Sequence, residues 1–439
     1  MRPLLYSILL LLLSTSAAYA TADVHEVVAS SGFKALILED HQLPVVSVQI
    51  VFRKSGHAFD PQGQEGLSHS VSELLDEGSG NLSGTEFHRQ LENAAISLGV
   101  SEDSDNFTIN IKCLTEHLPK ALALVKTAIT APHFDDDAIR RIISDINSER
   151  TEKNDEPETL AIITWQQIYY GSKPYGQSGL GTRTSLNTIT PNDLKHFVHS
   201  HFTQDHLIIS AAGDISNKTL KPLLDDFIDA LPAKSEPSPV IDASGPATGS
   251  VQVIEKPLSQ SVAIFGEKSL LRSNPDFYAT YVLNYVIGGG SFESRLMKTV
   301  REDKGLAYTV YTFLNMNEYS VVLQGYVASS NDHIDQSVAI IRKQLADLRD
   351  HGVTQQELQD AKDYMTLSFA LKLDSTESLT EFLTTMQLFH LGNDFIAKRN
   401  SYVNQVTLAD VNRVAKQILD PDHLTVVIVG HPEEPKHGK

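Results

Sequence analysis

Apolar and polar residues alternate along two stretches of the chain, residues 35–52 and 251–265. Such alternation is typical of half-buried β-strands, because successive side chains point to opposite faces of a sheet. In the first stretch, the residues that share one face are Val46, Val48, Ile50 and Phe52. Each stretch therefore predicts a β-hairpin.

A longer period, close to that of the α-helix, marks four amphipathic segments. Helices are predicted at 117–130, 135–150, 333–348 and 354–373. The order is the same in both halves of the chain, with strands followed by two consecutive helices. This order indicates an α+β fold, in which each half forms a mostly antiparallel sheet with helices packed on it.

A shorter repeat aligns the two halves. Thr190 and Asp193 precede a helical pattern, Asp205-His206-Leu207, an apolar run and Gly213. In the second half, Thr407 and Asp410 precede a helical pattern, Asp422-His423-Leu424, an apolar run and Gly430. Both copies run 23 residues from Thr to Gly (213 − 190 and 430 − 407), and they are offset by 217 residues (407 − 190). Each Thr is predicted to cap its helix, and each apolar run to form a buried strand.

Between the copies, residues 231–250 contain four prolines among Ser, Ala, Gly and Thr, with almost no periodic apolar pattern. This composition is typical of an interdomain linker. The predicted organisation is a signal peptide at 1–20, an N-terminal domain at 21–231, a linker at 232–250, a C-terminal domain at 251–432 and a tail at 433–439. In a protein with two related domains, the functional groove commonly lies between them.

The signal peptide follows from three features at the start of the chain. Arg2 supplies a positive charge, residues 4–13 form an apolar run too short to span a bilayer, and Ala18-Tyr19-Ala20 fits a cleavage site. No later stretch approaches membrane-spanning length. Cys113 is the single cysteine, which excludes an internal disulfide and favours the periplasm over a disulfide-rich extracellular setting.

Composition narrows the function further. With 41% hydrophobic and 21% charged residues, the chain is expected to be globular rather than disordered or collagen-like. Its formal net charge is -19, from 36 basic and 55 acidic residues. This charge argues against nucleic acid or an anionic membrane surface as the main partner, since both attract clustered Lys and Arg. Basic peptide segments remain open as ligands.

A helical motif at residues 66–75 places two polar residues on one face. Its apolar stripe consists of Leu67, Val71, Leu74 and Leu75. His69 and Glu73 are one helical turn apart and share another face. A further carboxylate, Glu149, follows on the next predicted long helix. Local chemistry alone predicts no more than a polar pair on a half-buried helix.

Other histidines give weaker signals. His57 and His88 have no partner at ligand spacing and are predicted to be surface residues. A cluster at 196–206 contains four histidines, but the duplicate segment replaces most of them with other residues. We therefore expect no metal site there.

A second motif lies in the C-terminal half, where Gly288, Gly289 and Gly290 are followed by Arg301 and Tyr308. From local chemistry, the glycines end a helix, Arg301 is a solvated cation near a helix C-terminus, and Tyr308 is a half-buried strand residue. The intervening Gly305 suits a left-handed capping position.

These motifs together resemble the insulinase and pitrilysin family of zinc peptidases, the inverzincins. The resemblance is carried by Ser55-Gly56, by Gly66-Leu67-Ser68-His69, by Glu149 and by the C-terminal motif, and it covers essentially the whole chain after the signal peptide. It is strongest to short bacterial members similar to subunits of the mitochondrial processing peptidase. It implies two homologous α+β domains.

In active members an H-x-x-E-H helix supplies two zinc-binding histidines and a glutamate that acts as general base, and a distal Glu completes the ligands. On this pattern His69 matches the first His, Ser72 falls at the base and Glu73 at the second His, while Glu149 matches the distal Glu. A Ser hydroxyl cannot take a proton from metal-bound water at neutral pH. The resemblance thus implies a degenerate site, at which a metal ion could bind but hydrolysis is not expected.

The resemblance gives the C-terminal motif a sharper role. Active relatives carry an Arg and a Tyr in an R-x-x-x-G-x-x-Y setting, and this pair reaches across the interdomain cleft to the substrate near its scissile carbonyl. Arg301 and Tyr308 match the pair and are predicted catalytic residues that position substrate. Gly288, Gly289 and Gly290 match the substrate loop beside the cleft.

In short members of the family two chains can pair, one with the zinc motif and the other with the Arg/Tyr pair. The resemblance implies that this chain is the non-catalytic, substrate-binding subunit of a heterodimeric zinc metallopeptidase, with zinc in a homologous partner and peptide or unfolded protein as substrate. A scaffold without proteolytic role is an alternative. A self-sufficient metallopeptidase using His69, Glu73 and Glu149 is a further one.

Overall fold

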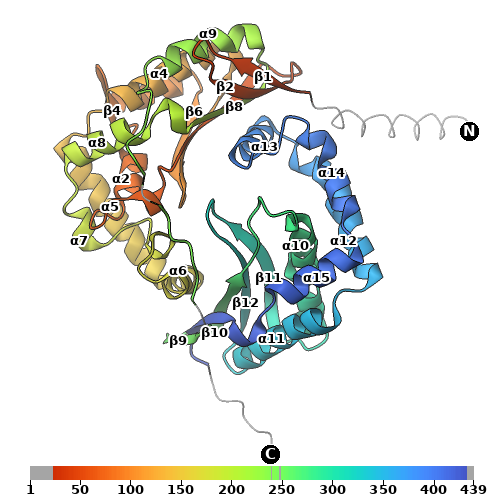
Figure 1. Cartoon of the computed structure of the whole chain (residues 1–439). Coiled ribbons are helices and arrows are strands. Elements are labelled where there is room, and N and C mark those ends of the chain that lie inside the picture. The colour runs from red at the N-terminus through yellow and green to blue at the C-terminus, as the bar shows by residue number, and fades with distance from the viewer. Residues whose placement is uncertain (1–22, 239, 247–248, 433–439) are drawn as a thin grey trace, which may run out of the picture.

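The computed structural model of the chain describes residues 23–238, 240–246 and 249–432. The predicted signal peptide at 1–20 and the tail at 433–439 lie outside these residues. Two large sheets organise the molecule, one in each half of the chain, at the upper left and lower right of Figure 1. None of the described helices is long and apolar enough to cross a membrane.

The N-terminal sheet has six strands in the order β1-β2-β8-β3-β7-β6. In that order they are β1 (Val24–Val28), β2 (Lys34–Glu39), β8 (Leu207–Gly213), β3 (Val45–Arg53), β7 (Asn106–Leu114) and β6 (Ser97–Glu102). β2 and β8 run parallel, and every other neighbouring pair in this sheet is antiparallel. A separate two-stranded ribbon joins β4 (Gly78–Ser79) to β5 (Leu82–Ser83).

The C-terminal sheet has five strands in the order β11-β12-β10-β13-β9. In that order they are β11 (Ala307–Met316), β12 (Val321–Ser330), β10 (Gln260–Lys268), β13 (Thr425–Gly430) and β9 (Val251–Glu255). β9 and β13 are parallel, and the other pairs are antiparallel. Except for the extra edge strand β1, the two sheets share one topology, and the predicted α+β class with mostly antiparallel sheets is confirmed.

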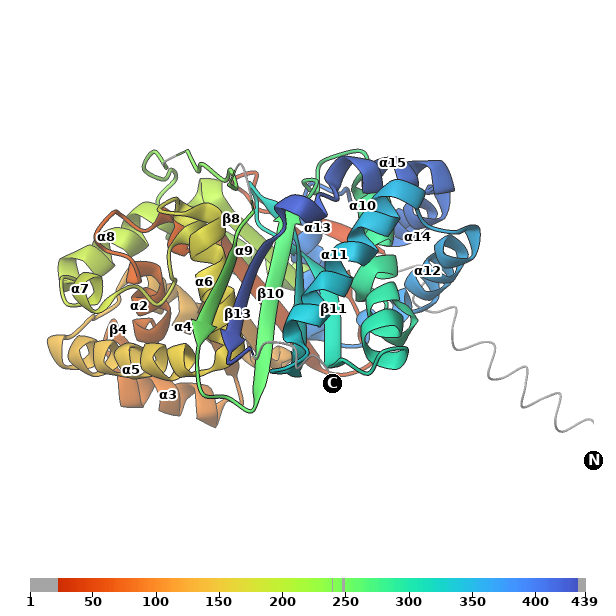
Figure 2. The same ribbon diagram turned by 90° about the horizontal axis from the view of Figure 1, so that it is seen from below.

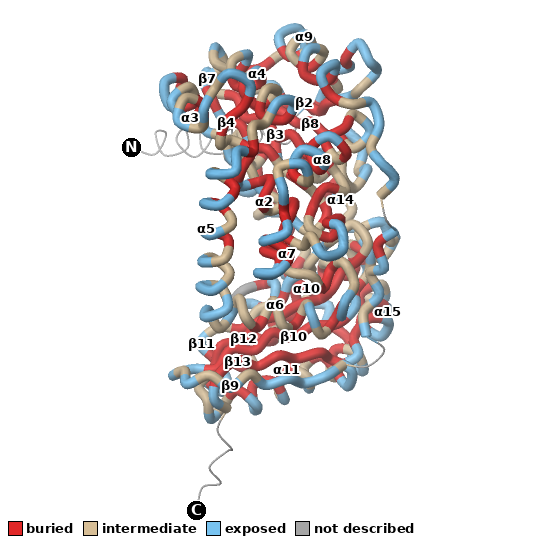
Figure 3. The backbone as a smooth tube through the Cα atoms, turned by 90° about the vertical axis from the view of Figure 1, so that its left-hand side faces the viewer, coloured by how far each residue is buried: buried red, intermediate tan, exposed pale blue. Residues whose placement is uncertain are grey.

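The two predicted hairpins are wrong. β2 and β3 are strands, but β8 lies between them, and β13 separates β9 from β10 in the same way. β8 and β13 are buried at every position, as expected of central strands covered on both faces. Alternation identifies a strand but not its neighbour, so a buried strand from later in the chain can enter between two consecutive ones. Figure 3 shows the buried strands β10 and β13 as continuous red traces.

Helices from the same half cover one face of each sheet. In the N-terminal half these are α2 (Leu67–Leu74), α3 (Gly84–Asn93), α4 (Leu118–Thr130), α5 (Asp136–Asp155), α7 (Arg183–Leu186), α8 (Pro191–His201) and α9 (Asn217–Ile228). In the C-terminal half they are α10 (Phe277–Asn284), α11 (Ile334–His351), α12 (Gln355–Leu367), α14 (Phe395–Gln405) and α15 (Leu408–Ile418). The four predicted long helices are α4, α5, α11 and α12, although α12 ends at Leu367 rather than at residue 373.

The short repeat folds as predicted. Thr190 Oγ1 accepts a hydrogen bond from Asp193 N (3.3 Å), and Asp193 Oδ2 accepts one from Thr190 N (2.8 Å). Thr407 and Asp410 form the same capping box at 3.2 and 3.0 Å. These reciprocal bonds satisfy two backbone donors that a helix start leaves free, which explains why α8 and α15 begin 217 residues apart (408 − 191).

The remaining face of each sheet is covered by a helix from the opposite half. α6 (Pro157–Tyr170) packs on β13 and β10, as Figures 1 and 2 show, and α13 (Thr376–Leu388) packs on β8, β3 and β2. Trp165 Nε1 on α6 donates a hydrogen bond to Thr425 O (3.0 Å), and Thr384 Oγ1 on α13 donates one to Ser210 Oγ (2.9 Å). The two halves therefore interlock, since each lends one helix to the core of the other.

A second junction joins the β11–β12 turn to the N-terminal half. Glu318 N donates a hydrogen bond to Asp105 Oδ2 (2.6 Å), and the Glu318 carboxylate pairs with Arg53 (2.7 Å). The described residues of the predicted linker, 232–250, form neither helix nor strand and run between α9 and β9. The exact domain boundaries stay a prediction.

Candidate functional site

The helix that carries His69, α2, is held at its first turn by a buried carboxylate. Asp60 accepts hydrogen bonds from the backbone N–H groups of Gly66 (2.8 Å), Leu67 (3.1 Å) and Ser68 (2.9 Å). Burial raises the pKa of Asp60 to about 7, although these backbone donors oppose the shift. Gly66 has a φ of 91°, a conformation that favours glycine. The start of α2 is thereby fixed at one place against the N-terminal core.

His69 lies between two carboxylates from other elements. Its Nδ1 is 3.6 Å from Glu102 Oε1, and its Nε2 is 3.7 Å from Glu149 Oε2 on α5. The structure therefore brings His69 and Glu149 together. Glu149 is shared, because its Oε1 is 2.7 Å from Lys153 Nζ. Glu73 is exposed and forms no ion pair among the described residues. It lines a cavity of about 340 Å³ that His69 also lines.

His57 is part of this cluster, so its prediction as a surface residue is wrong. Its side chain is 17% exposed, and its Nδ1 lies 2.8 Å from Glu102 Oε2. Its backbone N–H also donates to that oxygen (3.2 Å). A Cβ on Gly56 would lie 2.1 Å from Asp103 O, so only glycine allows the two chain segments to meet here. The Ser55-Gly56 pair was the only sequence signal near His57, and it does not point to Glu102.

The cluster is strongly charged. Burial opposes ionisation of Glu102, but the hydrogen bond with His57 and the nearby imidazole of His69 outweigh burial and lower the pKa of Glu102 to about 2. Burial likewise opposes the imidazolium forms of His57 and His69, but Glu102 outweighs it and raises the pKa of both histidines. Both histidines are therefore more basic than a free imidazole, and their imidazolium forms pair with the Glu102 carboxylate.

This donor set does not fit a catalytic zinc centre. His69 is the one nitrogen ligand of the family pattern, and the exposed Glu73 stands in place of the second. Ser72 Oγ donates a hydrogen bond to His69 O of the same helix (2.8 Å). The hydroxyl at the position of the base is therefore used within α2, and a Ser hydroxyl is too weak a base to deprotonate a metal-bound water at neutral pH.

The C-terminal motif presents a different arrangement. Arg301 lies in η8 (Met297–Glu302), and Tyr308 lies on the edge strand β11. The Arg301 guanidinium carbon is 5.1 Å from the ring centre of Phe292 and 5.4 Å from that of Tyr308. Arg301 forms no ion pair within the described part of the chain. A cation held between two aromatic faces keeps its donors free for a ligand.

Tyr308 is 76% exposed rather than half-buried. The pairing of β11 with β12 shifts between Ala307 and Thr309, so Tyr308 sits in a β-bulge. A bulge turns a side chain away from its regular direction and is common beside functional sites. Gly305 has a φ of 62° and donates its N–H to Arg301 O (2.9 Å), which confirms the predicted left-handed cap.

The three glycines allow close packing next to this pair. Gly288 and Gly289 end the π-helical turn η6 (Tyr285–Gly289), and Gly290 follows it. A Cβ on Gly288 would lie 2.6 Å from Thr312 N on β11, and one on Gly290 would lie 2.9 Å from the Tyr285 ring. The run lies against the strand that carries Tyr308. Contact with substrate stays a prediction.

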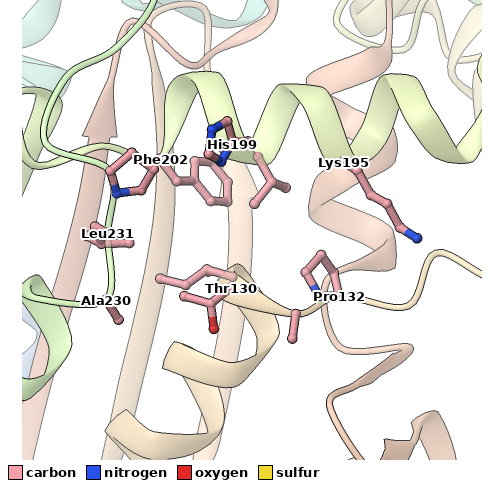
Figure 4. A pocket seen from close by; sticks show the side chains of 11 residues that line it. Thr130, Pro132, Lys195, His199, Phe202, Ala230 and Leu231 are labelled. Carbon is pink, nitrogen blue, oxygen red and sulfur yellow. The ribbon is translucent and has the colours of Figure 1, made fainter.

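Two other features carry less chemistry. Asp76, Glu77 and His88 place three ligand-type atoms within 4.8 Å of one another, but Glu77 already pairs with Arg141 (2.5 Å). A cavity of about 580 Å³ lies between α4, α8 and the residues after α9. Figure 4 shows Lys195 and His199 on α8 above Thr130 and Pro132, with mostly apolar side chains around them.

Comparison with known proteins agrees with this architecture. Residues 34–183 match the family model described as insulinase (peptidase family M16), and residues 188–365 match the model described as peptidase M16 inactive domain. Together the two matches cover most of the chain. The chain belongs to the insulinase family, which confirms the predicted family.

The similar proteins include a Helicobacter pylori protein named "Non-peptidase homolog YmxG", 28% identical over 95% of this chain and 96% of the relative. A Bacillus subtilis protein named "Uncharacterized zinc protease YmxG" is 27% identical over 90% of this chain and 95% of the relative. A crystal structure of a peptidase M16 inactive domain from Pseudomonas fluorescens superposes with a TM-score of 0.88 at 23% identity, covering 94% of this chain and 99% of that one. The structural likeness shows that the fold is shared.

Proposed function

We propose that this protein is a non-catalytic, substrate-binding subunit of a heterodimeric insulinase-family zinc metallopeptidase. The observation that carries the proposal is the contrast between the two motifs. On α2 the Ser72 hydroxyl is bonded to its own helix at the position of the general base. On β11 and η8 the Tyr308 phenol is exposed and the Arg301 guanidinium is held beside it. The chain thus lacks the water-activating group but keeps the groups that handle substrate.

The chemistry of the pair supports this division. A fixed guanidinium and a phenol can donate hydrogen bonds to the carbonyl oxygen of an extended peptide, and such donors stabilise negative charge that develops on that oxygen during cleavage. The proposed partner is a homologous chain that carries an intact H-x-x-E-H motif and supplies zinc, its ligands and the general base. The name of the Helicobacter pylori relative, a non-peptidase homolog, agrees with the proposed lack of activity. The proposed location is the periplasm, because the chain starts with a predicted signal peptide.

The proposal is tested by reconstitution. The full chain is mixed with an H-x-x-E-H-bearing homologue from the same organism, and chelator-sensitive cleavage of a peptide library is measured. We expect no cleavage by this chain alone and cleavage by the pair. Arg301→Ala should lower kcat/KM by about 100-fold, the effect typical of losing one transition-state donor, while gel filtration shows intact pairing. Tyr308→Phe should have a smaller effect in the same direction.

Matched controls are available on the surface. Arg140→Ala changes an exposed arginine on α5, and Tyr364→Phe changes an exposed tyrosine on α12, so both should leave cleavage unchanged. Chelator-sensitive cleavage by this chain alone would contradict the interpretation of Ser72. Full activity of the pair with both Arg301→Ala and Tyr308→Phe would instead favour the alternative function, a scaffold that holds the active subunit.

A further inference from the structure

A cavity of about 350 Å³ in the C-terminal half is separate from both motifs. It is lined by Tyr169 from α6, by Pro246 and Gly249 from the segment between the halves, and by Glu267 and Ser269 at the end of β10. A Cβ on Gly249 would lie 1.8 Å from His423 O, so this segment packs tightly beside the cavity. Residues from both halves of the chain, and Pro246 and Gly249 of the segment between them, therefore border the cavity.

The matching place in the N-terminal half is filled. The sheet register pairs Phe52 with Phe107 in one half and Glu267 with Leu323 in the other, so Glu267 occupies the position of Phe52. Phe52 stacks on Phe202 at 4.4 Å between ring centres, and Phe107 lies 4.7 Å from Phe202. In the C-terminal half a carboxylate has replaced an aromatic ring at this buried position.

Glu267 is incompletely satisfied by the protein. It is 5% exposed, and its Oε2 accepts a hydrogen bond from Asp420 N (2.7 Å). Its Oε1 has no hydrogen-bond partner among the described residues, and neither has the hydroxyl of Ser269, which is 4% exposed and lines the same cavity. Burial raises the pKa of Glu267 to about 8, although the Asp420 N–H opposes this shift. A buried carboxylate oxygen without a hydrogen-bond donor lowers the stability of the fold. A ligand that supplies a donor there would restore that lost stability.

We propose that this cavity binds a small organic cation with an ammonium or guanidinium group. Such a group would donate to Glu267 Oε1 and Ser269 Oγ, and its charge would be balanced by Glu267. The Asp420 carboxylate also lines the cavity but already pairs with His423 (2.7 Å), and Lys268 lines it with an exposed side chain. The buried ring of Tyr169, which stacks on Trp165 at 4.6 Å between ring centres, also lines the cavity and adds an aromatic contact. A divalent metal fits less well, because Glu267 belongs to no group of three metal-type ligands among the described residues.

Binding is tested on the full chain by calorimetry with agmatine and putrescine as free amines and with N-acetylarginine amide as a basic side chain. 1,4-Butanediol serves as the uncharged probe. We expect one of the cations to bind and the diol not to bind. Glu267→Gln should weaken that binding about tenfold or more, because a charge-assisted hydrogen bond is lost. Glu92→Gln, which changes an exposed glutamate on α3, should have no effect.

A second variant keeps the idea testable without a ligand. Glu267→Leu restores an apolar residue at the position of Phe52, and it should raise the unfolding temperature of the ligand-free protein and abolish cation binding. Equal binding by wild type and Glu267→Gln, or no binding of any cation, would overturn the proposal. A lower unfolding temperature for Glu267→Leu would also overturn it, because the carboxylate would then be a structural group.

Discussion

Helices α6 and α13 occupy equivalent places in the two halves but use different chemistry. α6 presents aromatic side chains, in which the fully buried Trp165 stacks on Tyr169 at 4.6 Å between ring centres. α13 adds hydroxyls and an amide to its buried apolar side chains. Thr384 Oγ1 donates to Ser210 Oγ (2.9 Å), and Gln387 Nε2 donates to Ile209 O (3.0 Å). One sheet is therefore covered mainly by apolar contact, whereas the other is covered by apolar side chains of α13, among them Leu379, Leu383 and Met386, together with a polar network.

The sheet faces match their helices. The face under α6 is apolar, with Val262, Ile264, Val427 and Val429. The face under α13 includes buried Ser47, Gln49 and Ser210. Apolar burial stabilises in proportion to area, whereas hydrogen bonds require one alignment and contribute less each. The difference teaches that the shared topology determines which helix covers which sheet, while the side chains decide how strongly and how specifically it is held.

The largest effect on stability is expected at α6, the helix that presents aromatic side chains. Trp165→Ala removes a fully buried ring and leaves Thr425 O without its donor, so it should lower the free energy of unfolding by about 3–5 kcal/mol. Chemical denaturation followed by circular dichroism measures the loss. Leu367→Ala, which truncates a side chain that is 79% exposed, is the control and should change stability very little. A loss of stability smaller than that caused by Ser210→Ala would contradict the idea that the aromatic contacts of α6 contribute more stability than the polar contacts of α13.

An intermediate effect is expected at the charged cluster beside α2, which has no counterpart at the apolar helix α10. His57→Gln removes the closest partner of the buried Glu102 carboxylate and should cost about 2 kcal/mol at pH 6. The pKa of His57 is raised in the folded protein, so its contribution is complete below the ordinary imidazole pKa and is lost as the pH rises through the raised value.

The pH dependence is measured by denaturation of wild type and His57→Gln between pH 6 and 9. The difference in stability should shrink toward pH 9. His196→Gln, at a side chain that is 64% exposed, should show no such trend. A difference that grows with pH would show that His57 is neutral in the folded protein.

The smallest effect on stability is expected in the polar network between α13 and the N-terminal sheet. Ser210→Ala removes the oxygen that accepts from the Thr384 hydroxyl and from Gln387 Nε2 (2.8 Å), whereas Gln387 keeps its bond to Ile209 O, so the cost should be about 1 kcal/mol. Denaturation of Ser210→Ala beside Ser144→Ala, an exposed serine on α5, measures it. If Ser210→Ala were more stable than wild type, the polar network would orient α13 on the sheet without stabilising the fold.

Local features of the fold were predictable because their signals lie within a few residues. The capping boxes at Thr190 and Thr407 form where the sequence places them, since both partners of each box belong to one helical turn. The strand neighbours were not predictable, because β8 enters between β2 and β3 from far along the chain. The exchange of α6 and α13 between the halves left no signal in either helix alone.

The candidate site divides in the same way. The missing base at Ser72 and the pairing of Arg301 with Tyr308 were predicted from the resemblance to the insulinase family, because the residues of this chain could be matched to the family pattern one by one. Glu102 was missed because it is the last residue of an ordinary alternating strand, and its partner His57 comes from another segment. The exposure of Tyr308 depends on a bulge in the pairing of β11 with β12, which concerns two strands at once.

The sequence by itself determined the α+β class, the duplication, the helix caps and the residue types at both motifs, because these depend on short spacings and on the chemistry of single side chains. Only the tertiary structure decided which strand lies at the centre of each sheet, which helix crosses to the other half, and which carboxylate meets His57 and His69. Each of these depends on the burial of surfaces from distant segments, and burial exists only once the chain has folded.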